Sequence, residues 1–249
     1  MSEKKLQHFY IAEEQSIYLM SHKDATKLKE WFKLCQQQLN SLGYTNTYLL
    51  GKGAYGFVFN AENEKKEQFV FKFSRLNLPQ NVQDRLEEES EIQAQLAHPQ
   101  IPQVIEYYKI KRQSILHMQR APGIDLEKVS FKRGPLPPEL IVNIAIQLTE
   151  ILIHLRTSSL HKTGKPYVHG DIKPSNIVYD EETNKVYLID WGSSVIAQVD
   201  ENGNSTSNNV MDLMSSDLQQ TNARLGDVYF IGPEQINGGL SSPRFDEQG

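Results

Sequence analysis

Two short stretches in the second half of the chain hold side chains that could together handle a metal-bound phosphate group. Residues 169–176 read His-Gly-Asp-Ile-Lys-Pro-Ser-Asn, and residues 188–192 read Leu-Ile-Asp-Trp-Gly. Asp171 could accept the proton of an incoming hydroxyl, and Lys173 could neutralise a phosphoryl group in flight. The combined spacing favours this chemistry over the alternative, a polar loop with solvated acids.

The two stretches form one site if the chain folds back between them. A hairpin turning at residues 180–185 would pair Ile177 with Ile189 and set Asn176 opposite Asp190, with Cα atoms roughly 5 Å apart. An amide oxygen and a carboxylate at that separation suit Mg²⁺, which takes a few protein oxygens together with substrate phosphates. The sequence therefore predicts a metal site made by Asn176 and Asp190.

A glycine-rich stretch in the first half could bind the phosphates. Residues 51–58 have the spacing G-x-G-x-x-G-x-V through Gly51, Gly53, Gly56 and Val58. Glycines let backbone N–H groups approach phosphate oxygens without a Cβ in the way. Strand-forming residues lie on both sides, which predicts a β-hairpin lid rather than the strand-to-helix turn of a dinucleotide site.

A lysine follows on the next predicted strand, at residues 68–73. With a turn centred on Lys65, an antiparallel register sets Val58 opposite Lys72, and alternation puts Val58, Val70 and Lys72 on one face. Two apolar side chains beside an ammonium suit an adenine ring whose phosphates reach the lysine.

That lysine needs an acidic partner to hold it. The charged helix predicted at residues 80–97 offers Glu87, Glu88, Glu89 and Glu91, and spacing alone does not select one. An ion pair at about 4 Å in a partly buried site is worth a few kcal/mol at most. Such an energy is enough to bias the position of a helix.

The elements around these motifs change character along the chain. The first part contains short β runs, and the second part opens with a long amphipathic helix. The strands are expected at 47–50, 57–61, 68–73, 103–110, 114–119, 167–168, 177–179 and 186–189, and the long helix at 139–160. Before them, Leu28, Trp31, Phe32, Cys35, Leu39 and Leu42 recur at helical spacing. This earlier helix either packs on the next domain or binds a regulatory partner.

These motifs resemble the eukaryotic-type (Hanks-type) protein kinase family from about Tyr44 to the end of the chain. The resemblance implies an α+β, bilobal fold with a small β-rich N-lobe, a larger helical C-lobe and ATP in the cleft between them. The expected domains are a helical extension at 1–43, the N-lobe at 44–121 and the C-lobe at 122–249.

The resemblance also implies roles for single residues. Lys72 would hold the α/β-phosphates; Glu89, placed by its distance from His98, would be its helix partner, with Glu91 as the second choice. Asp171 would be the catalytic base, Lys173 the lysine typical of serine/threonine kinases, and Asn176 and Asp190 the metal ligands. The expected nucleotide-binding set is Gly51, Gly53, Gly56, Val58, Val70, Lys72, Glu89, Met118 as gatekeeper, Gln119 and Ala121 through their backbones, and Val178. Residues 232–234, Gly-Pro-Glu, would close an activation segment covering 193–232.

The sequence departs from the family at four places. Gly170 replaces the arginine that usually precedes the catalytic aspartate, which argues against activation by an activation-loop phosphate. Trp191 replaces a phenylalanine, and Asp227 stands where serine/threonine kinases usually carry a threonine. The chain also stops at Gly249, where the family continues. We expect a fragment whose C-lobe is incomplete, so that the missing portion or a partner is needed for activity.

The expected activity is transfer of the γ-phosphate of ATP, with Mg²⁺ or alternatively Mn²⁺, to a serine or threonine of a protein substrate. A small-molecule kinase of the aminoglycoside or choline type shares the His-Gly-Asp motif with a later Asn and Asp, whereas Lys173-Pro174, the glycine-rich loop and Gly232-Pro233-Glu234 favour a protein substrate. An inactive pseudokinase scaffold is the other alternative, although every residue that the chemistry needs is present.

Composition limits the setting of the protein. The 249 residues carry a formal net charge of −5 with a pI near 5.8, which argues against nucleic acid as a partner. The single cysteine, Cys35, fits a cytoplasmic location. The most apolar stretch, 141–155, is interrupted by polar residues, so no membrane segment is expected.

Overall fold

The computed structural model describes residues 9–10, 19–20, 22–52, 56–75, 83–110, 113–157, 164–197, 229–230 and 245–247. The chain divides into two compact units. The first comprises residues 1–87 and 104–120, and the second comprises residues 88–103 and 121–249. Helix α3 (Arg85–Gln93) runs from the first unit into the second.

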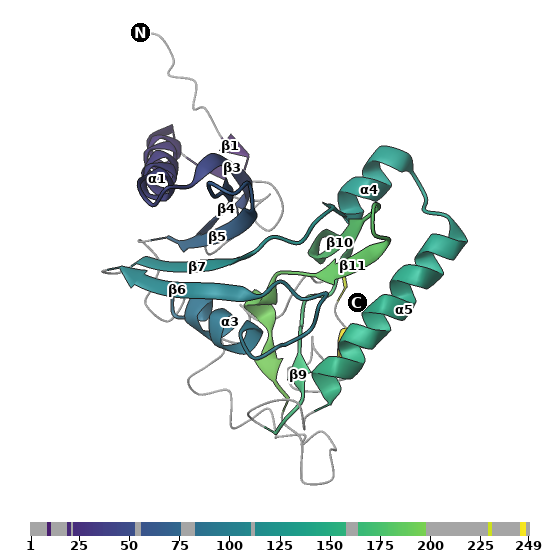
Figure 1. Ribbon diagram of the computed structural model, residues 1–249. Coiled ribbons are helices and arrows are strands. Elements are labelled where there is room, and N and C mark those ends of the chain that lie inside the picture. Colours follow the sequence, from purple (N-terminus) through teal and green to yellow (C-terminus); the bar gives the residue numbers. More distant parts are fainter. Residues whose placement is uncertain are drawn as a thin grey trace. The chain divides into compact units, whose positions relative to one another are not determined.

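The first unit is built on a five-stranded antiparallel sheet with the order β3-β4-β5-β7-β6 (Figure 1). Its strands are β3 (Thr45–Lys52), β4 (Gly56–Glu62), β5 (Gln68–Ser74), β6 (Val104–Ile110) and β7 (Gln113–Gln119). Two further short strands, β1 (Phe9–Tyr10) and β2 (Leu19–Met20), pair with each other. The predicted strands are thus confirmed, most of them one or two residues longer than expected.

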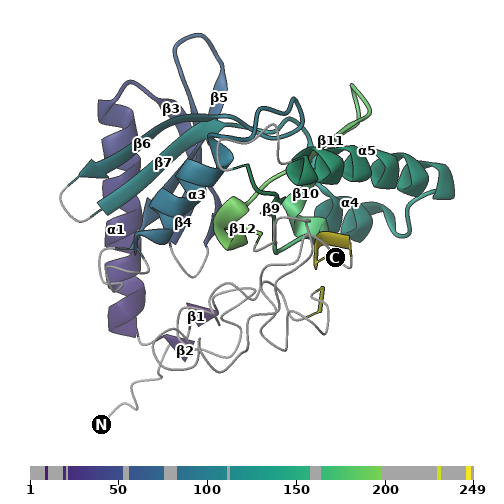
Figure 2. The same cartoon turned by 90° about the horizontal axis from the view of Figure 1, so that it is seen from below.

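Alternation along β4 and β5 gives the sheet two different faces. Val58 pairs with Lys72, as predicted. The intervening positions carry aromatic rings that are at most 1% exposed: Phe57, Phe59, Phe71 and Phe73. Helix α1 (His22–Ser41) packs against this aromatic face through Cys35 and Leu39 (Figures 1 and 2). The prediction that the N-terminal helix packs on the next domain is therefore confirmed for α1.

The second unit combines helices with short strands. Helix α4 (Leu126–Arg133) precedes α5 (Pro138–Arg156). Strands β8 (Ile124–Asp125), β10 (Ile177–Asp180) and β11 (Lys185–Leu188) form a sheet with the order β11-β10-β8. Strand β9 (Tyr167–Val168) pairs with β12 (Val195–Ile196). Three short 3₁₀ turns complete the described part: η2 (Pro174–Asn176), η3 (Trp191–Ser193) and η4 (Phe245–Glu247).

The core of the second unit gathers around α5. Ile144, Ile151 and Leu155 of α5 pack with Leu96 and with Trp191, which is completely buried. By length and composition alone, α5 could also cross a membrane. Its opposite side leaves apolar residues half-exposed, namely Ile141, Val142, Ile146 and Ile153.

The register of the β10–β11 hairpin differs from the prediction by one residue. Ile177 pairs with Leu188, not with Ile189. The physical reason is the turn at residues 181–184, which holds four residues. Asp180 accepts hydrogen bonds from Glu182 N (3.2 Å) and Thr183 Oγ1 (2.5 Å), and Asn184 adopts a left-handed conformation with φ 55°.

Candidate active site

The three predicted catalytic side chains lie together in the segment that runs from the end of β9 through η2. Lys173 Nζ is 3.2 Å from Asp171 Oδ2. Asn176 Nδ2 donates to the same carboxylate oxygen at 2.9 Å and to the Asp171 carbonyl oxygen at 2.8 Å. Both bonds use the amide nitrogen, so the amide oxygen of Asn176 remains the atom that can ligate a cation.

The second predicted metal ligand, Asp190, follows the end of β11. Ile189 N donates to Asn176 O at 3.0 Å, so Asp190 lies one residue past the position opposite Asn176. Asp190 is exposed and adopts φ 64° and ψ 76°, a left-handed conformation. For a residue with a side chain this costs roughly 1–3 kcal/mol, and such strain concentrates at functional sites.

Among the four candidate acids of α3, the structure buries only one. Glu89 is 5% exposed, whereas Glu88 and Glu91 are exposed and Glu87 is half-buried. A Cβ added to Gly192 would lie 3.5 Å from Glu89 Oε2 and 3.7 Å from Asp190 Oδ1. The carboxylates of Glu89 and Asp190 therefore both lie beside Gly192.

A buried carboxylate, which the sequence did not reveal as a site residue, holds the backbone of the catalytic loop. Asp246 accepts hydrogen bonds from His169 N at 2.7 Å and Gly170 N at 2.8 Å. It is 6% exposed. Burial raises the pKa of its carboxyl group, and the nearby His169 and the two N–H donors oppose that rise. The sequence offered no local signal for this role, because Asp246 is far along the chain from the loop.

The side chain of His169 joins the loop to the segment that carries Asp190. Its Nδ1 accepts from Asp171 N at 3.3 Å, and its Nε2 lies 3.0 Å from Ile189 O. Because Nδ1 accepts, Nε2 is the nitrogen that donates to the Ile189 carbonyl oxygen. The ring also meets Trp191 edge-on, with 4.6 Å between centroids. His169 and Trp191 therefore fix the backbone on both sides of the predicted metal ligand.

Gly170, which stands in place of the expected arginine, adopts φ 80°. A Cβ at this position would lie 2.8 Å from the carbonyl oxygen of Ser193. Any side chain here, arginine included, therefore requires the backbone around Ser193 to shift.

The nucleotide-binding residues predicted in the first half lie along the first unit's sheet. Gly51 has open space where a Cβ would stand, as a ligand-facing backbone requires. Gly56 is different, because its Cβ would lie 1.7 Å from Phe73 O. The close packing of β4 against β5 is therefore enough to explain why residue 56 is a glycine, without any contact to a phosphate.

An apolar group flanks Lys72 on its own face of the sheet. Val70 pairs with Met118, and Lys72 pairs with Leu116. Met118 is 6% exposed and packs with Leu116, Leu86 and Val70. This is the surface that the sequence analysis assigned to adenine. Gln119, at the end of β7, is exposed.

The remaining assigned residues are divided between the second unit and segments outside the described residues. Ala121 and Val178 are 9% and 7% exposed, and both belong to the second unit. Gly53, Asp227, the 232–234 segment and most of the predicted activation segment lie outside the described residues. The first unit thus carries the glycines, Val58, Val70, Lys72 and Met118, and the second carries Glu89, Asp171, Lys173, Asn176 and Asp190.

Comparison with known proteins defines the class. The protein kinase domain family matches residues 44–246, and the chain belongs to this family. The α+β architecture, with a β-rich first unit, agrees with it. Helix α1 lies outside the matched region.

Several bacterial serine/threonine-protein kinases are similar to this chain. PknH of Mycobacterium bovis is 30% identical over 147 residues, which cover 58% of this chain and 23% of the relative. PknE of the same organism is 25% identical over 201 residues, covering 80% of this chain and 31% of the relative. PrkC of Bacillus subtilis is 27% identical over 162 residues, covering 65% of this chain and 21% of the relative. The chain spans less than a third of the length of these curated relatives.

Proposed function

We propose that this chain transfers the γ-phosphate of ATP to a serine or threonine hydroxyl of a protein substrate. The observation that carries the proposal is the cluster of Asp171, Lys173 and Asn176, in which one carboxylate contacts an ammonium and an amide. The similar proteins PknH, PknE and PrkC are named serine/threonine-protein kinases, which supports the acceptor class.

Each member of the cluster has a chemical task in this proposal. Asp171 accepts the proton of the attacking hydroxyl, and Lys173 stabilises the negative charge that develops on the transferred group. The amide oxygen of Asn176 and the carboxylate of Asp190 are hard oxygen ligands and fit Mg²⁺ or Mn²⁺. A metal ion held there would screen the phosphate charges and orient them for transfer.

The first unit supplies the nucleotide contacts in the same proposal. The ammonium of Lys72 pairs with phosphate oxygens, and the apolar side chains of Val58, Val70 and Met118 contact the adenine ring. Glu89 is proposed as the acid that orients Lys72. The open space at Gly51 leaves room for a phosphate near the backbone.

The proposed setting is the cytoplasm, with a protein and not a nucleic acid as the partner. Cys35 is buried in the first unit's core, and burial raises the pKa of its thiol to about 12. The thiol is therefore protonated near neutral pH and unreactive toward disulfide formation.

Radiolabelled phosphate transfer from Mg·ATP to a generic protein substrate tests the proposal. Asp171→Asn removes the proton acceptor and should lower kcat about 10²- to 10⁴-fold, while Mg·ATP still raises the melting temperature. Glu182→Gln, a change at an exposed acid of the β10–β11 turn, should leave kcat unchanged.

The outcomes separate the competing functions. Transfer to a panel of small alcohols but not to protein would favour a small-molecule kinase. Binding of Mg·ATP by the unmodified chain without any transfer would mean a scaffold and overturn the proposal.

A further inference from the structure

Helix α1 lies outside the region matched to the protein kinase family, yet it covers the aromatic face of the first unit's sheet. Without α1, Phe57 and Phe59 would lose their ring contacts with Trp31 and Phe32. Burying one such side chain is worth roughly 1.5–3 kcal/mol. The helix is therefore part of the first unit's fold, and its contacts show which part of the sheet it supports.

The aromatic contacts of α1 concentrate on the start of β4. The Trp31 ring lies 4.6 Å from the Phe57 ring, at an interplanar angle of 32°. Phe32 meets Phe57 edge-on at 6.1 Å and lies 5.3 Å from Phe59. One turn further along the helix, Gln36 Nε2 donates to Thr47 O of β3 at 2.9 Å. The helix thus holds both strands that flank the glycine-rich loop.

Phe57 stands at the base of that loop. It follows Gly56, the last glycine, and it pairs with Lys52 on the other strand. Gly56 cannot move closer to β5, because it already lies against the Phe73 carbonyl oxygen. The next residue, Val58, is on the opposite face, beside Lys72. A displacement of the Phe57 ring therefore moves the backbone of Gly56 and Val58 together.

We propose that α1 is a positioning element for the two strands that flank the glycine-rich loop, and that Trp31 acts on Gly56 and Val58 through Phe57. The proposal rests on the proposed ATP-binding function of that loop. Trp31 touches no substrate in this proposal; it sets the position of Gly56 and Val58, which the proposed function places at the nucleotide. Loss of the ring contact should therefore weaken Mg·ATP binding, while kcat at saturating ATP changes little.

The test compares three variants of the same helix in the full chain. Trp31→Ala removes the ring that contacts Phe57, and it should raise the Kd and KM for Mg·ATP about 5- to 50-fold, with kcat within about twofold. Leu34→Ala changes a side chain that is 60% exposed on the same helix, and both constants should stay at their original values. Trp31→Phe keeps an aromatic ring and should restore most of the binding.

A stability control separates positioning from general loosening of the fold. Leu39 is completely buried near the other end of α1, where its carbonyl accepts from Tyr44 N. Leu39→Ala should lower the melting temperature without changing the Kd for Mg·ATP, measured well below the melting transition. If Trp31→Ala does not fold, Trp31→Leu replaces it with an apolar side chain that lacks the ring.

Each result decides the question. A Kd that rises in Trp31→Ala, but not in Trp31→Phe or Leu39→Ala, supports the proposal. Equal Kd values in Trp31→Ala and Leu39→Ala, at equal folded fractions, would overturn it. If the unmodified chain binds no Mg·ATP at all, the proposed function of the loop fails. If the unmodified chain binds Mg·ATP and Trp31→Ala leaves its Kd unchanged, only the proposed role of Trp31 fails.

Discussion

At the scale of single residues, the carboxylate of Asp246 shows how the catalytic loop is held. Its two oxygens each accept one backbone N–H, from His169 and from Gly170. Asp246→Asn replaces one acceptor with an NH₂ group that faces a donor. We expect a stability loss of about 2–3 kcal/mol and a fall in kcat of roughly 10- to 100-fold.

Thermal melting and phosphate-transfer kinetics check both effects. Glu247→Gln is the matched control, since it changes the neighbouring acid, which is exposed and pairs with Arg156. An exposed pair is worth at most about 1 kcal/mol. Equal losses in the two variants would contradict the support assigned to Asp246.

Gly170 offers a second test at the residue scale. Gly170→Ala places a Cβ 2.8 Å from Ser193 O, in addition to the cost of its positive φ. Gly134 has a similar φ of 77° but open space around its Cβ position. We expect a loss of about 1 kcal/mol for Gly134→Ala and about 2–4 kcal/mol for Gly170→Ala, measured by chemical denaturation. Similar losses would mean that the Ser193 contact relaxes freely.

The sequence could reveal Asp171, Lys173 and Asn176 because they lie within one short loop, where spacing constrains geometry. It could select Glu89 only through the family resemblance; the structure adds that Glu89 is the buried acid of α3. Asp246 was not predicted, because no local pattern marks a carboxylate that accepts a hydrogen bond from a backbone N–H 77 residues away. Roles of this kind come from tertiary contacts, and their residues carry no periodic signal.

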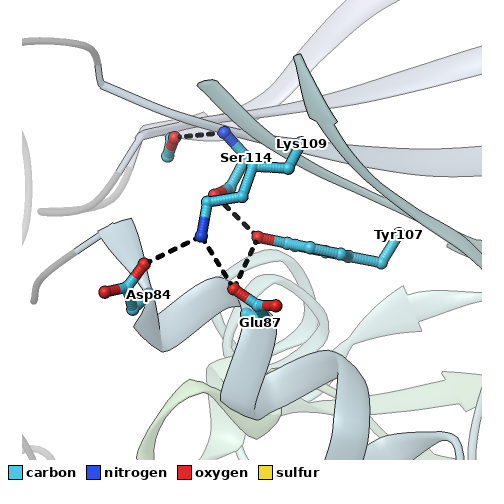
Figure 3. Close-up of polar contacts among 6 residues, drawn as sticks. Asp84, Glu87, Tyr107, Lys109 and Ser114 are labelled. Carbon is cyan, nitrogen blue, oxygen red and sulfur yellow. Dashed lines mark hydrogen bonds and ion pairs between the residues drawn. The ribbon is translucent and has the colours of Figure 1, made fainter. Parts of the chain in front are cut away.

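At the scale of elements, a polar network ties the start of α3 to the sheet (Figure 3). Lys109 Nζ of β6 lies 3.2 Å from Asp84 Oδ1 and 3.0 Å from Glu87 Oε2. Tyr107 Oη donates to Ser114 Oγ at 2.8 Å and lies 3.4 Å from the same Glu87 oxygen. The pKa of Lys109 is raised, first by its hydrogen bond to Glu87 and then by that to Asp84.

Because α3 also carries Glu89, this network should affect catalysis more than stability. Lys109→Met should lower kcat/KM for ATP about two- to fivefold with little change in melting temperature, since exposed pairs contribute little to folding. At about 1 M salt, kcat/KM of the unmodified chain should fall toward the value of the variant, because screening weakens the same ion pairs. Lys66→Met is the control; its pair with Glu62 lies in the β4–β5 hairpin. A loss in Lys66→Met equal to that in Lys109→Met would contradict the role of the network.

Prediction found the strands of the first unit, α5 and the short strands β9, β10 and β11, but it missed α4. The strands of the first unit and α5 follow clear patterns. Helix α4 was not predicted, because only Leu126 and Val129 of its residues are buried. Its signals were the caps, in which Asp125 accepts from Lys128 N and Gly134 ends the helix. The one-residue error in the β10–β11 register arose because alternation does not specify how many residues a turn holds.

At the scale of the whole molecule, the covered aromatic face of the first unit's sheet places a histidine in an apolar environment. His117 of β7 is 4% exposed and stacks on Phe71 at 4.3 Å, with an interplanar angle of 7°. Tyr44 Oη lies 3.4 Å from its Nε2. Among the described residues, its buried Nδ1 has no hydrogen-bond partner. Burial lowers the pKa of His117 to about 4, and the charge of Glu106 opposes this only in part.

This histidine should make folding sensitive to acid. The unfolded chain binds the proton near pH 6.5, whereas the folded chain does so only near pH 4. The stability contribution is therefore complete above pH 6.5 and decreases as the pH falls toward 4, by at most about 3 kcal/mol. Urea denaturation of the full chain between about pH 7.5 and about pH 4.5 measures how the free energy of unfolding depends on pH. This range covers most of the interval between the two pKa values.

His117→Phe removes the titrating group and keeps a ring that fits among Phe69 and Phe71, so its stability should change less between those pH values. The pKa of His98, in the second unit, is also lowered, chiefly by burial. His98 is present in both proteins, and the difference between the two pH profiles therefore belongs to His117. Parallel profiles would show that the histidine is already solvated in the folded chain, and that the aromatic face beneath α1 is more open than its contacts indicate.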